Sequence, residues 1–140
     1  MAILGLDLGK KTLGIAKSDA LGIPHPLEVF RFPYEGYQKA ISRVIELVNE
    51  LNISEIALGL PLHLNGSESD MSKVVRIFKD KLLEALPSIK IELIDERYSS
   101  TMSLRNLSTM GVNAKNAKSV VDMAAAQEIL STYLRMKGNK

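Results

Sequence analysis

Four acidic residues follow short apolar segments or lie among apolar neighbours, where carboxylates can bind a metal ion. They are Asp7, Asp95, Glu96 and Asp122. A carboxylate at the end of a buried strand is unfavourable unless a cation or hydrogen-bond donors compensate its charge. Several such acids can share one or two divalent ions, which activate water and stabilise the leaving oxygen in phosphodiester hydrolysis. The sequence therefore predicts a metal-dependent hydrolytic site whose acids are far apart in the chain.

The first acid opens a motif that reads Asp-Leu-Gly-Lys-Lys-Thr-Leu-Gly from Asp7 to Gly14. Gly9 would let backbone N–H groups approach phosphate oxygens, and Lys10 and Lys11 add positive charge at the same place. We therefore expect Gly9, Lys10 and Lys11 to bind substrate. A hairpin turn that is simply capped by Asp7 explains the same pattern, and both interpretations stay open.

A second segment, Gly59–Ser67, reads Gly-Leu-Pro-Leu-His-Leu-Asn-Gly-Ser and follows a short apolar strand. Ligands of open α/β sheets bind where parallel strands end, and the N-terminus of a following helix can hold an anion. Asn65 in this loop is therefore expected to contact substrate. His63 is better explained as an ordinary loop residue, and the whole segment could be a plain connection between strand and helix.

The segment Ile94–Thr101 contains two adjacent acids and several groups that could bind phosphate. Adjacent residues at a strand end project to opposite faces, so normally only one of Asp95 and Glu96 can face the first acid. The alternation of apolar residues does not decide between them. Arg97 and Ser100 are expected to hold a phosphate group or to cap the next helix. An exposed ion pair followed by a helix cap is the simpler alternative.

Asp122 lies in a segment of small and apolar residues that is predicted to be helical. Ser119 stands three residues before it, which matches a capping pattern that the helix dipole favours. The apolar neighbours instead indicate a helix that faces a sheet, with the acid near the strand ends. Both interpretations stay open.

The composition restricts the available chemistry to oxygen ligands. The 140-residue chain has no Cys and two His, so a thiolate nucleophile, disulfides and Cys-ligated zinc are excluded. A carboxylate site favours Mg²⁺ or Mn²⁺. Within a net charge of +2, residues from Arg97 onward include seven basic and two acidic side chains, which suits a phosphate backbone or a solvated helix surface. Neither a signal peptide nor an apolar span of about 20 residues is recognisable, so a cytoplasmic protein is expected.

The elements that must position these residues are predicted to form one domain over residues 1–140. Three strands are expected at Ala2–Asp7, Thr12–Lys17 and Leu27–Phe32, joined as hairpins. Apolar periodicity then predicts, in order, a helix over Tyr37–Leu51, a strand at Ile56–Leu60, a helix that starts at a Ser67–Asp70 capping box, a strand at Ile89–Ile94, and helices at Thr101–Met110 and Ser119–Met136. Strands separated by helices pair in parallel. The expected α/β fold is thus a mixed five-stranded sheet, with three antiparallel strands followed by parallel additions, flanked by helices.

Four segments together resemble the YqgF/RuvX family. They are Asp7–Asp19 (DLGKKTLGIAKSD), Gly59–Ser69 (GLPLHLNGSES), Asp95–Ser100 (DERYSS) and Val120–Leu130 (VVDMAAAQEIL). The likeness covers nearly the whole chain and keeps the order of the family's motifs. Members of this family are described as Holliday junction resolvases and as nucleases that process the 5′ end of pre-16S rRNA. The resemblance implies an RNase H-like fold and a metal-dependent endonuclease.

The resemblance also implies roles for individual residues. Asp7, Glu96 and Asp122 would bind the metal and act in catalysis, with Asp95 as the alternative acid after the last strand. Lys115 and Lys118 match the basic segment before the final helix of the family and would contact substrate.

The leading expectation is a Mg²⁺- or Mn²⁺-dependent endonuclease that acts on structured nucleic acid. Pre-16S rRNA is favoured over branched DNA by the resemblance alone. Because only 5% of residues are aromatic and Trp is absent, little base stacking and a steep dependence on salt are expected. A homodimer would suit a two-fold DNA junction. The alternatives are a non-catalytic nucleic-acid or ribosome-associated binding module and an ATP-using kinase or ATPase, which would need a second Gly-rich phosphate motif that the chain lacks.

Overall fold

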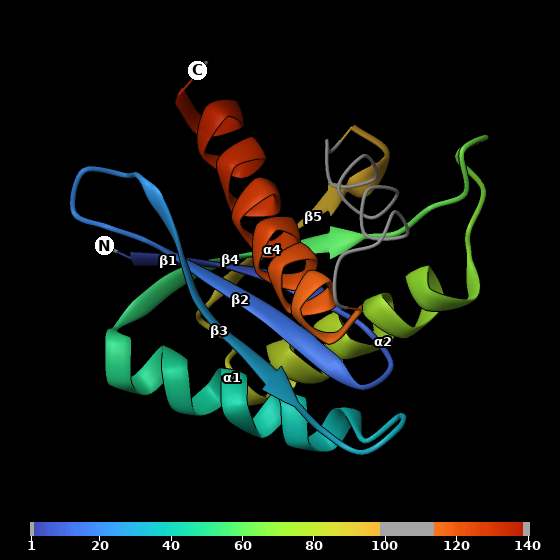
Figure 1. Cartoon of the computed structure of the whole chain (residues 1–140). Coiled ribbons are helices and arrows are strands. Elements are labelled where there is room, and N and C mark those ends of the chain that lie inside the picture. Colours follow the sequence, from blue (N-terminus) through green and yellow to red (C-terminus); the bar gives the residue numbers. More distant parts are fainter. Residues whose placement is uncertain (1, 99–113, 139–140) are drawn as a thin grey trace.

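Five strands form one mixed sheet in the order β3-β2-β1-β4-β5, as Figure 1 shows. The computed structural model describes residues 2–98 and 114–138, with side chains for residues 2–97 and 123–138. β1 (Ala2–Leu8), β2 (Thr12–Ser18) and β3 (Pro24–Arg31) are antiparallel neighbours. β4 (Ile53–Leu60) and β5 (Lys90–Asp95) pair in parallel with β1 and with each other. The predicted mixed sheet is confirmed.

Helices cover the two faces of the sheet unequally. Two helices, α1 (Tyr37–Leu51) and α2 (Asp70–Ala85), pack on one face, where the larger apolar core lies. The long helix α4 (Ala114–Gly138) crosses the other face, which we call the α4 face (Figure 1). The sheet is thus buried on both sides, which explains why β1 reads as a nearly continuous apolar run.

The close approach of α4 depends on a glycine in β1. A Cβ atom on Gly5 would lie 2.6 Å from both the Ala126 carbonyl oxygen and the Leu130 Cβ. Real Cβ atoms do not come that close to other atoms, so only glycine fits under this turn of the helix. The contact fixes the position of α4 along β1, and it thereby fixes which residues of the helix reach the end of the strand.

Two predicted boundaries differ from the structure because the local hydrogen bonding differs. The second helix is capped by Ser69, not Ser67: the Ser69 hydroxyl accepts the Ser72 N–H at 2.9 Å, and Ser72 Oγ accepts the Ser69 N–H at 2.8 Å. β3 begins at Pro24 instead of Leu27, because β3 is an edge strand and an edge strand tolerates proline.

Two other elements begin earlier than predicted. The last helix begins at Ala114, five residues before the expected start, and β4 begins at Ile53, three residues early. The predicted helix at Thr101–Met110 lies outside the described residues. No helix in the described parts of the chain is long and apolar enough to cross a membrane.

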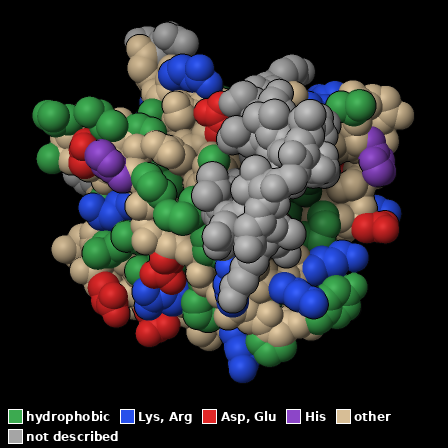
Figure 2. All heavy atoms as spheres, in the orientation of Figure 1, with side chains coloured by type: hydrophobic (Ala, Val, Ile, Leu, Met, Phe, Trp, Pro, Cys, Tyr) green, Lys and Arg blue, Asp and Glu red, His purple; other side chains and the backbone are tan. Residues whose placement is uncertain are grey.

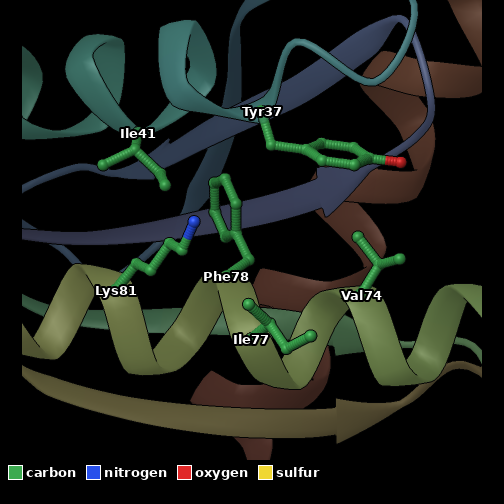
Figure 3. A pocket seen from close by; sticks show the side chains of 6 residues that line it. All are labelled: Tyr37, Ile41, Val74, Ile77, Phe78 and Lys81. Carbon is green, nitrogen blue, oxygen red and sulfur yellow. The ribbon is translucent and has the colours of Figure 1, made fainter.

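A small apolar cleft of about 170 Å³ opens between α1 and α2 (Figure 3). Its lining residues are Tyr37, Ile41, Val74, Ile77, Phe78 and Lys81. These two helices pack on the face opposite α4. The cleft is therefore separated by the sheet from the acids discussed next.

Candidate active site

The carboxyl ends of β1, β4 and β5 meet at one end of the sheet, which we call the carboxyl end. The ladder pairs Leu6 with Leu58 across β1 and β4, and Leu60 with Asp95 across β4 and β5. Asp7 follows Leu6 directly, so it lies beside Gly59 on the neighbouring strand, about 4.8 Å away in the pairing direction. The predicted acids of two distant segments are therefore brought to one place.

Asp7 is the second-to-last residue of β1, and its side chain lies on the face covered by α4. It shares the parity of Ile3, which belongs to the core under α4, and of Gly5, which the helix covers. The residue is only 8% exposed. A carboxylate that is buried to this extent needs compensation by donors or by a cation. Asp7 is thus placed as the sequence predicts, at the end of a buried strand.

The Glu96 carboxylate lies directly above Gly59 on the same face. A Cβ on Gly59 would be 3.1 Å from both the carboxyl carbon and Oε1 of Glu96, and 2.5 Å from Ile129 Cδ1 of α4. Because Gly59 neighbours Asp7 across the ladder, the two carboxylates project over adjacent positions of the α4 face. The glycine provides the space in which the Glu96 carboxylate sits.

Asp95 takes the opposite direction and binds its neighbour Arg97. The Asp95 carboxylate accepts from Arg97 Nε at 2.9 and 3.1 Å, from Nη2 at 2.7 Å and from the Arg97 backbone N–H at 2.9 Å. These bonds, led by the side-chain bond to the guanidinium, hold the pKa of Asp95 below its usual value. The structure therefore puts Glu96, and not Asp95, on the face of Asp7. The metal-binding role of Glu96 itself stays a prediction.

Helix α4 runs antiparallel to β4, and this direction brings its N-terminal half to the acids. Near the start of β4, the Tyr133 hydroxyl donates to Glu55 at 2.6 Å, while Ile129, one turn earlier in the helix, reaches Gly59 near the end of the strand. Each earlier turn of α4 therefore lies nearer the carboxyl end of the sheet.

The backbone of Asp122 falls over the end of β1 by the same geometry. Ala126 lies on Gly5, and Asp122 is four residues, or about 6 Å of helix rise, before Ala126. Asp7 is two residues, or about 6.6 Å, beyond Gly5 in the same direction. The side chain of Asp122 is outside the described set, so its contact with a metal remains a prediction.

The donor set fits a hard divalent cation. Among the described side chains, no group of three or more acidic or His residues is placed to hold a metal ion. Asp7 and Glu96 supply two carboxylates, and Asp122 is the third candidate by backbone position. Carboxylate oxygens with no His or Cys are the ligands that Mg²⁺ and Mn²⁺ prefer.

Two lysines lie on the β1–β2 turn, at the carboxyl end of the sheet. The Gly9 N–H donates to the Thr12 carbonyl at 2.8 Å and closes the turn, and Lys10 and Lys11 are exposed at its tip. Figure 2 shows Lys or Arg side chains gathered at the lower right, in the region where Figure 1 places this turn. Their positive charge lies at the turn that follows Asp7, and their contact with a phosphate backbone stays a prediction.

The loop after β4 is tied to Arg97. Arg97 Nη1 donates to the Leu64 carbonyl at 3.3 Å and lies 3.1 Å from where a Cβ on Gly66 would be, at a φ of +88° that favours glycine. Asn65 is exposed, and its Oδ1 accepts from the N–H and the hydroxyl of Ser67 at 3.0 and 2.7 Å. Asn65 thus closes the loop, and its contact with substrate stays a prediction.

Three predicted substrate contacts cannot be placed. Ser100 lies outside the described residues. Lys115 and Lys118 lie on the first turns of α4, whose backbone is described without side chains. In contrast, the role of Gly59 is a feature that sequence reasoning missed. A glycine inside an apolar strand signals close approach of another group, and this signal could have found it.

Arg97 is expected to position Glu96, because its guanidinium and its backbone N–H both bind the Asp95 carboxylate and so join the residues that precede and follow Glu96. Arg97→Gln should destabilise the fold by about 2 kcal/mol, since charged hydrogen bonds contribute about that much, and should lower turnover at the carboxyl end. The measurements are thermal unfolding and the cleavage rate of a nucleic-acid substrate.

The matched control is Arg43→Gln. Arg43 makes a similar paired contact with Glu28 at 3.0 and 2.7 Å, and the side chains in both ion pairs are 22–28% exposed. Both variants should lose similar stability, but only Arg97→Gln should lose activity. Equal activity losses would show that Arg97 does not position the site.

This fold, with the buried Asp7 carboxylate near the end of β1 and the Glu96 carboxylate after β5, is RNase H-like. Two solved resolvases share it: Thermus thermophilus RuvC in complex with a Holliday junction (TM-score 0.60, 14% identity, 98% of this chain and 96% of that chain) and the fowlpox virus Holliday junction resolvase (TM-score 0.60, 12% identity, 98% and 99%). At these identities the likeness concerns the fold.

The sequence relationship identifies the family. The RuvX family profile, described as Holliday junction resolvase, matches residues 1–136. A Staphylococcus aureus (strain JH9) protein named "Putative pre-16S rRNA nuclease" is 37% identical over 133 residues, covering 94% of each chain. The chain belongs to the RuvX family. The resemblance seen in its motifs is confirmed, and so is its assignment as a nuclease at the level of the family.

Proposed function

We propose that the chain is a Mg²⁺- or Mn²⁺-dependent endonuclease that hydrolyses phosphodiester bonds of structured RNA, with the 5′ end of pre-16S rRNA as substrate in the cytoplasm. The observation that carries this proposal is the Glu96 carboxylate above Gly59, on the α4 face beside the buried Asp7. These two acids come from segments 89 residues apart and meet at one end of the sheet. A divalent cation bound between them would compensate the negative charge of both carboxylates.

Asp7, Glu96 and Asp122 would hold the metal. When bound, the ion supplies a more acidic water molecule and stabilises charge on the leaving oxygen. The chain's own residues bind and orient the substrate: the β1–β2 turn offers Lys10 and Lys11 to the phosphate backbone. Arg97 holds the strand end so that Glu96 points to the α4 face.

The choice of substrate follows from the relatives. The name of the Staphylococcus aureus protein supports pre-16S rRNA, whereas the family description and the junction-bound resolvase support a four-way DNA junction as the second candidate. A junction has two-fold symmetry and would require a homodimer. Precursor processing at a single site would not. A homodimer in solution would therefore favour the DNA junction, and the cleavage assay below tests the same choice of substrate.

The test uses the purified full chain with three labelled substrates: an RNA with the 5′-extended 16S sequence, a four-way DNA junction and a linear DNA duplex. Each is incubated with Mg²⁺, Mn²⁺ or EDTA. We expect cleavage of the RNA at a defined 5′ site with either metal and none in EDTA. Metal-dependent cutting of the junction alone would support the second candidate.

Two results would reject an endonuclease altogether. Tight binding of the RNA or the junction, with none of the three substrates cut under any metal condition, would indicate a non-catalytic binding module. ATP hydrolysis without nucleic-acid cleavage would indicate the ATPase alternative.

A further inference from the structure

Tyr34, in the loop between β3 and α1, exposes a large flat ring at the carboxyl end of the sheet. It is 56% exposed, more than any other aromatic side chain in the described parts of the chain. More than half of the surface of this residue is open to solvent. It offers a surface on which a nucleobase can stack.

The loop that carries Tyr34 is fastened to the β1–β2 turn. The Phe32 N–H donates to the Lys11 carbonyl at 2.9 Å, and the Glu35 N–H donates to the Lys10 carbonyl at 2.8 Å. The backbone of Tyr34 is therefore held between two hydrogen bonds to the β1–β2 turn.

Glu35 adopts a φ of +57°, which is unfavourable for a residue other than glycine. Conformations of this kind persist where the surrounding structure enforces them, and they cluster at binding and catalytic sites. Here the Glu35 N–H is bonded to the Lys10 carbonyl. The unfavourable backbone conformation thus lies next to the exposed ring. The same loop is hydrogen-bonded to the turn that follows Asp7.

Lys10 completes the group. Its Nζ lies 3.5 Å from the Tyr34 hydroxyl, to which it donates, and 5.8 Å from the ring centroid. Lys10 is three residues beyond Asp7, so their Cα atoms are at most about 11 Å apart. An aromatic surface and a cation lie together within reach of a nucleotide that adjoins the proposed cleavage site.

We propose that Tyr34 and Lys10 form a subsite for one unpaired nucleotide next to the scissile phosphate, in which the ring stacks on the base and the ammonium group binds the phosphate. This inference rests on the proposed function. It adds that the enzyme prefers to cleave beside a single-stranded segment. The low aromatic content still predicts little base stacking in total, but one well-placed ring is enough to stack on one base.

The test measures binding in EDTA, so that no metal or cleavage is involved. The probes are a labelled RNA hairpin with a single-stranded 5′ extension and the same hairpin with a blunt end. Tyr34→Ala should bind the extended hairpin about tenfold more weakly, the size typical of losing one stacked base. It should bind the blunt hairpin as the parent does. Tyr34→Phe keeps the ring and should bind both like the parent.

Lys10→Gln should lower the slope of log affinity against log salt by about 0.7 for the extended hairpin, as the loss of one phosphate contact to a single strand predicts. The control is Leu21→Ala, because Leu21 is 84% exposed in the β2–β3 loop at the opposite end of the sheet. It should change neither hairpin's affinity.

The inference is overturned if Tyr34→Ala binds the extended hairpin as tightly as the parent, or if it weakens both hairpins equally. These outcomes differ from failure of the proposed function. A parent that distinguishes the hairpins through Tyr34 but cuts no substrate would refute only the nuclease proposal. A parent that cuts RNA with Tyr34→Ala unaffected would refute only the subsite.

Discussion

Asp7→Asn should reduce metal-dependent cleavage at least about a hundredfold, which corresponds to about 3 kcal/mol of lost transition-state stabilisation. Asn keeps the size of the side chain but removes the charge that attracts a divalent cation. Because Asp7 is 8% exposed and beside Glu96, no exposed acid can easily replace it. The rate is measured under single-turnover conditions with saturating enzyme, so that weaker substrate binding does not enter.

A second measurement shows whether the lost activity reflects lost metal. A ligand that binds the native state stabilises it by RT ln(1 + [L]/Kd), about 2.7 kcal/mol when its concentration is a hundred times Kd. Mg²⁺ or Mn²⁺ should therefore raise the melting temperature of the parent and leave Asp7→Asn unchanged.

The control is Asp80→Asn, since Asp80 is exposed on α2, far in the fold from the carboxyl end. It should keep both the activity and the metal-dependent rise in melting temperature. If Asp7→Asn cuts at the parental rate, the acids do not hold a catalytic metal and the enzyme proposal is wrong.

The fold could be predicted because its determinants are local in the sequence. Alternating helical stripes and short apolar runs predict the order of elements, and the parallel pairing of β1 and β4 follows from the crossover through α1. The errors fall at boundaries decided by tertiary contacts. Pro24 joins an edge strand, and Ser69 rather than Ser67 caps α2, because the Ser69 hydroxyl accepts the Ser72 N–H, whereas Ser67 belongs to the preceding loop closed by Asn65.

The site was less predictable because it depends on how two segments meet. Ile91 and Ile94 in β5 are both buried but belong to different cores, so apolar alternation cannot show which of the two following acids faces α4. The 3-10 turn Glu96–Tyr98 and the bond between Asp95 and Arg97 decide it. The hydrophobic pattern of the sequence does not reveal this contact between Asp95 and Arg97, although the contact determines the direction of the Asp95 side chain.

Tyr34 illustrates the same limit. Nothing in the sequence around it differs from an ordinary loop after a strand, and its position depends on bonds to Lys10 and Lys11, more than twenty residues earlier. Catalytic acids are suggested by their chemistry, even when their partners are unknown. Residues that only orient or bind substrate carry little chemical signal, so the structure is needed to find them.

Gly59→Ala should impair both stability and activity, for separable reasons. The backbone accepts alanine, because the φ of Gly59 is outside the positive range. The added Cβ, however, would meet Ile129 Cδ1 at 2.5 Å and the Glu96 carboxylate at 3.1 Å. Overpacking against the buried Ile129 should destabilise the fold by about 1–3 kcal/mol. A displacement of Glu96 by about 1 Å should slow cleavage about a hundredfold, since misplacing a catalytic group by that distance has such an effect.

The two effects can be separated with Ile129→Val, which removes the Cδ1 atom that the new Cβ would meet. Alone, this substitution should cost about 1 kcal/mol and leave cleavage intact. Combined with Gly59→Ala, it should restore most of the lost stability, whereas the rate should stay low because the clash with Glu96 remains. Recovery of both would mean that Gly59 acts only through the packing of α4. A Gly59→Ala protein that cuts normally would mean that Glu96 does not need its place above this glycine, and the proposed pairing of its carboxylate with Asp7 would be wrong.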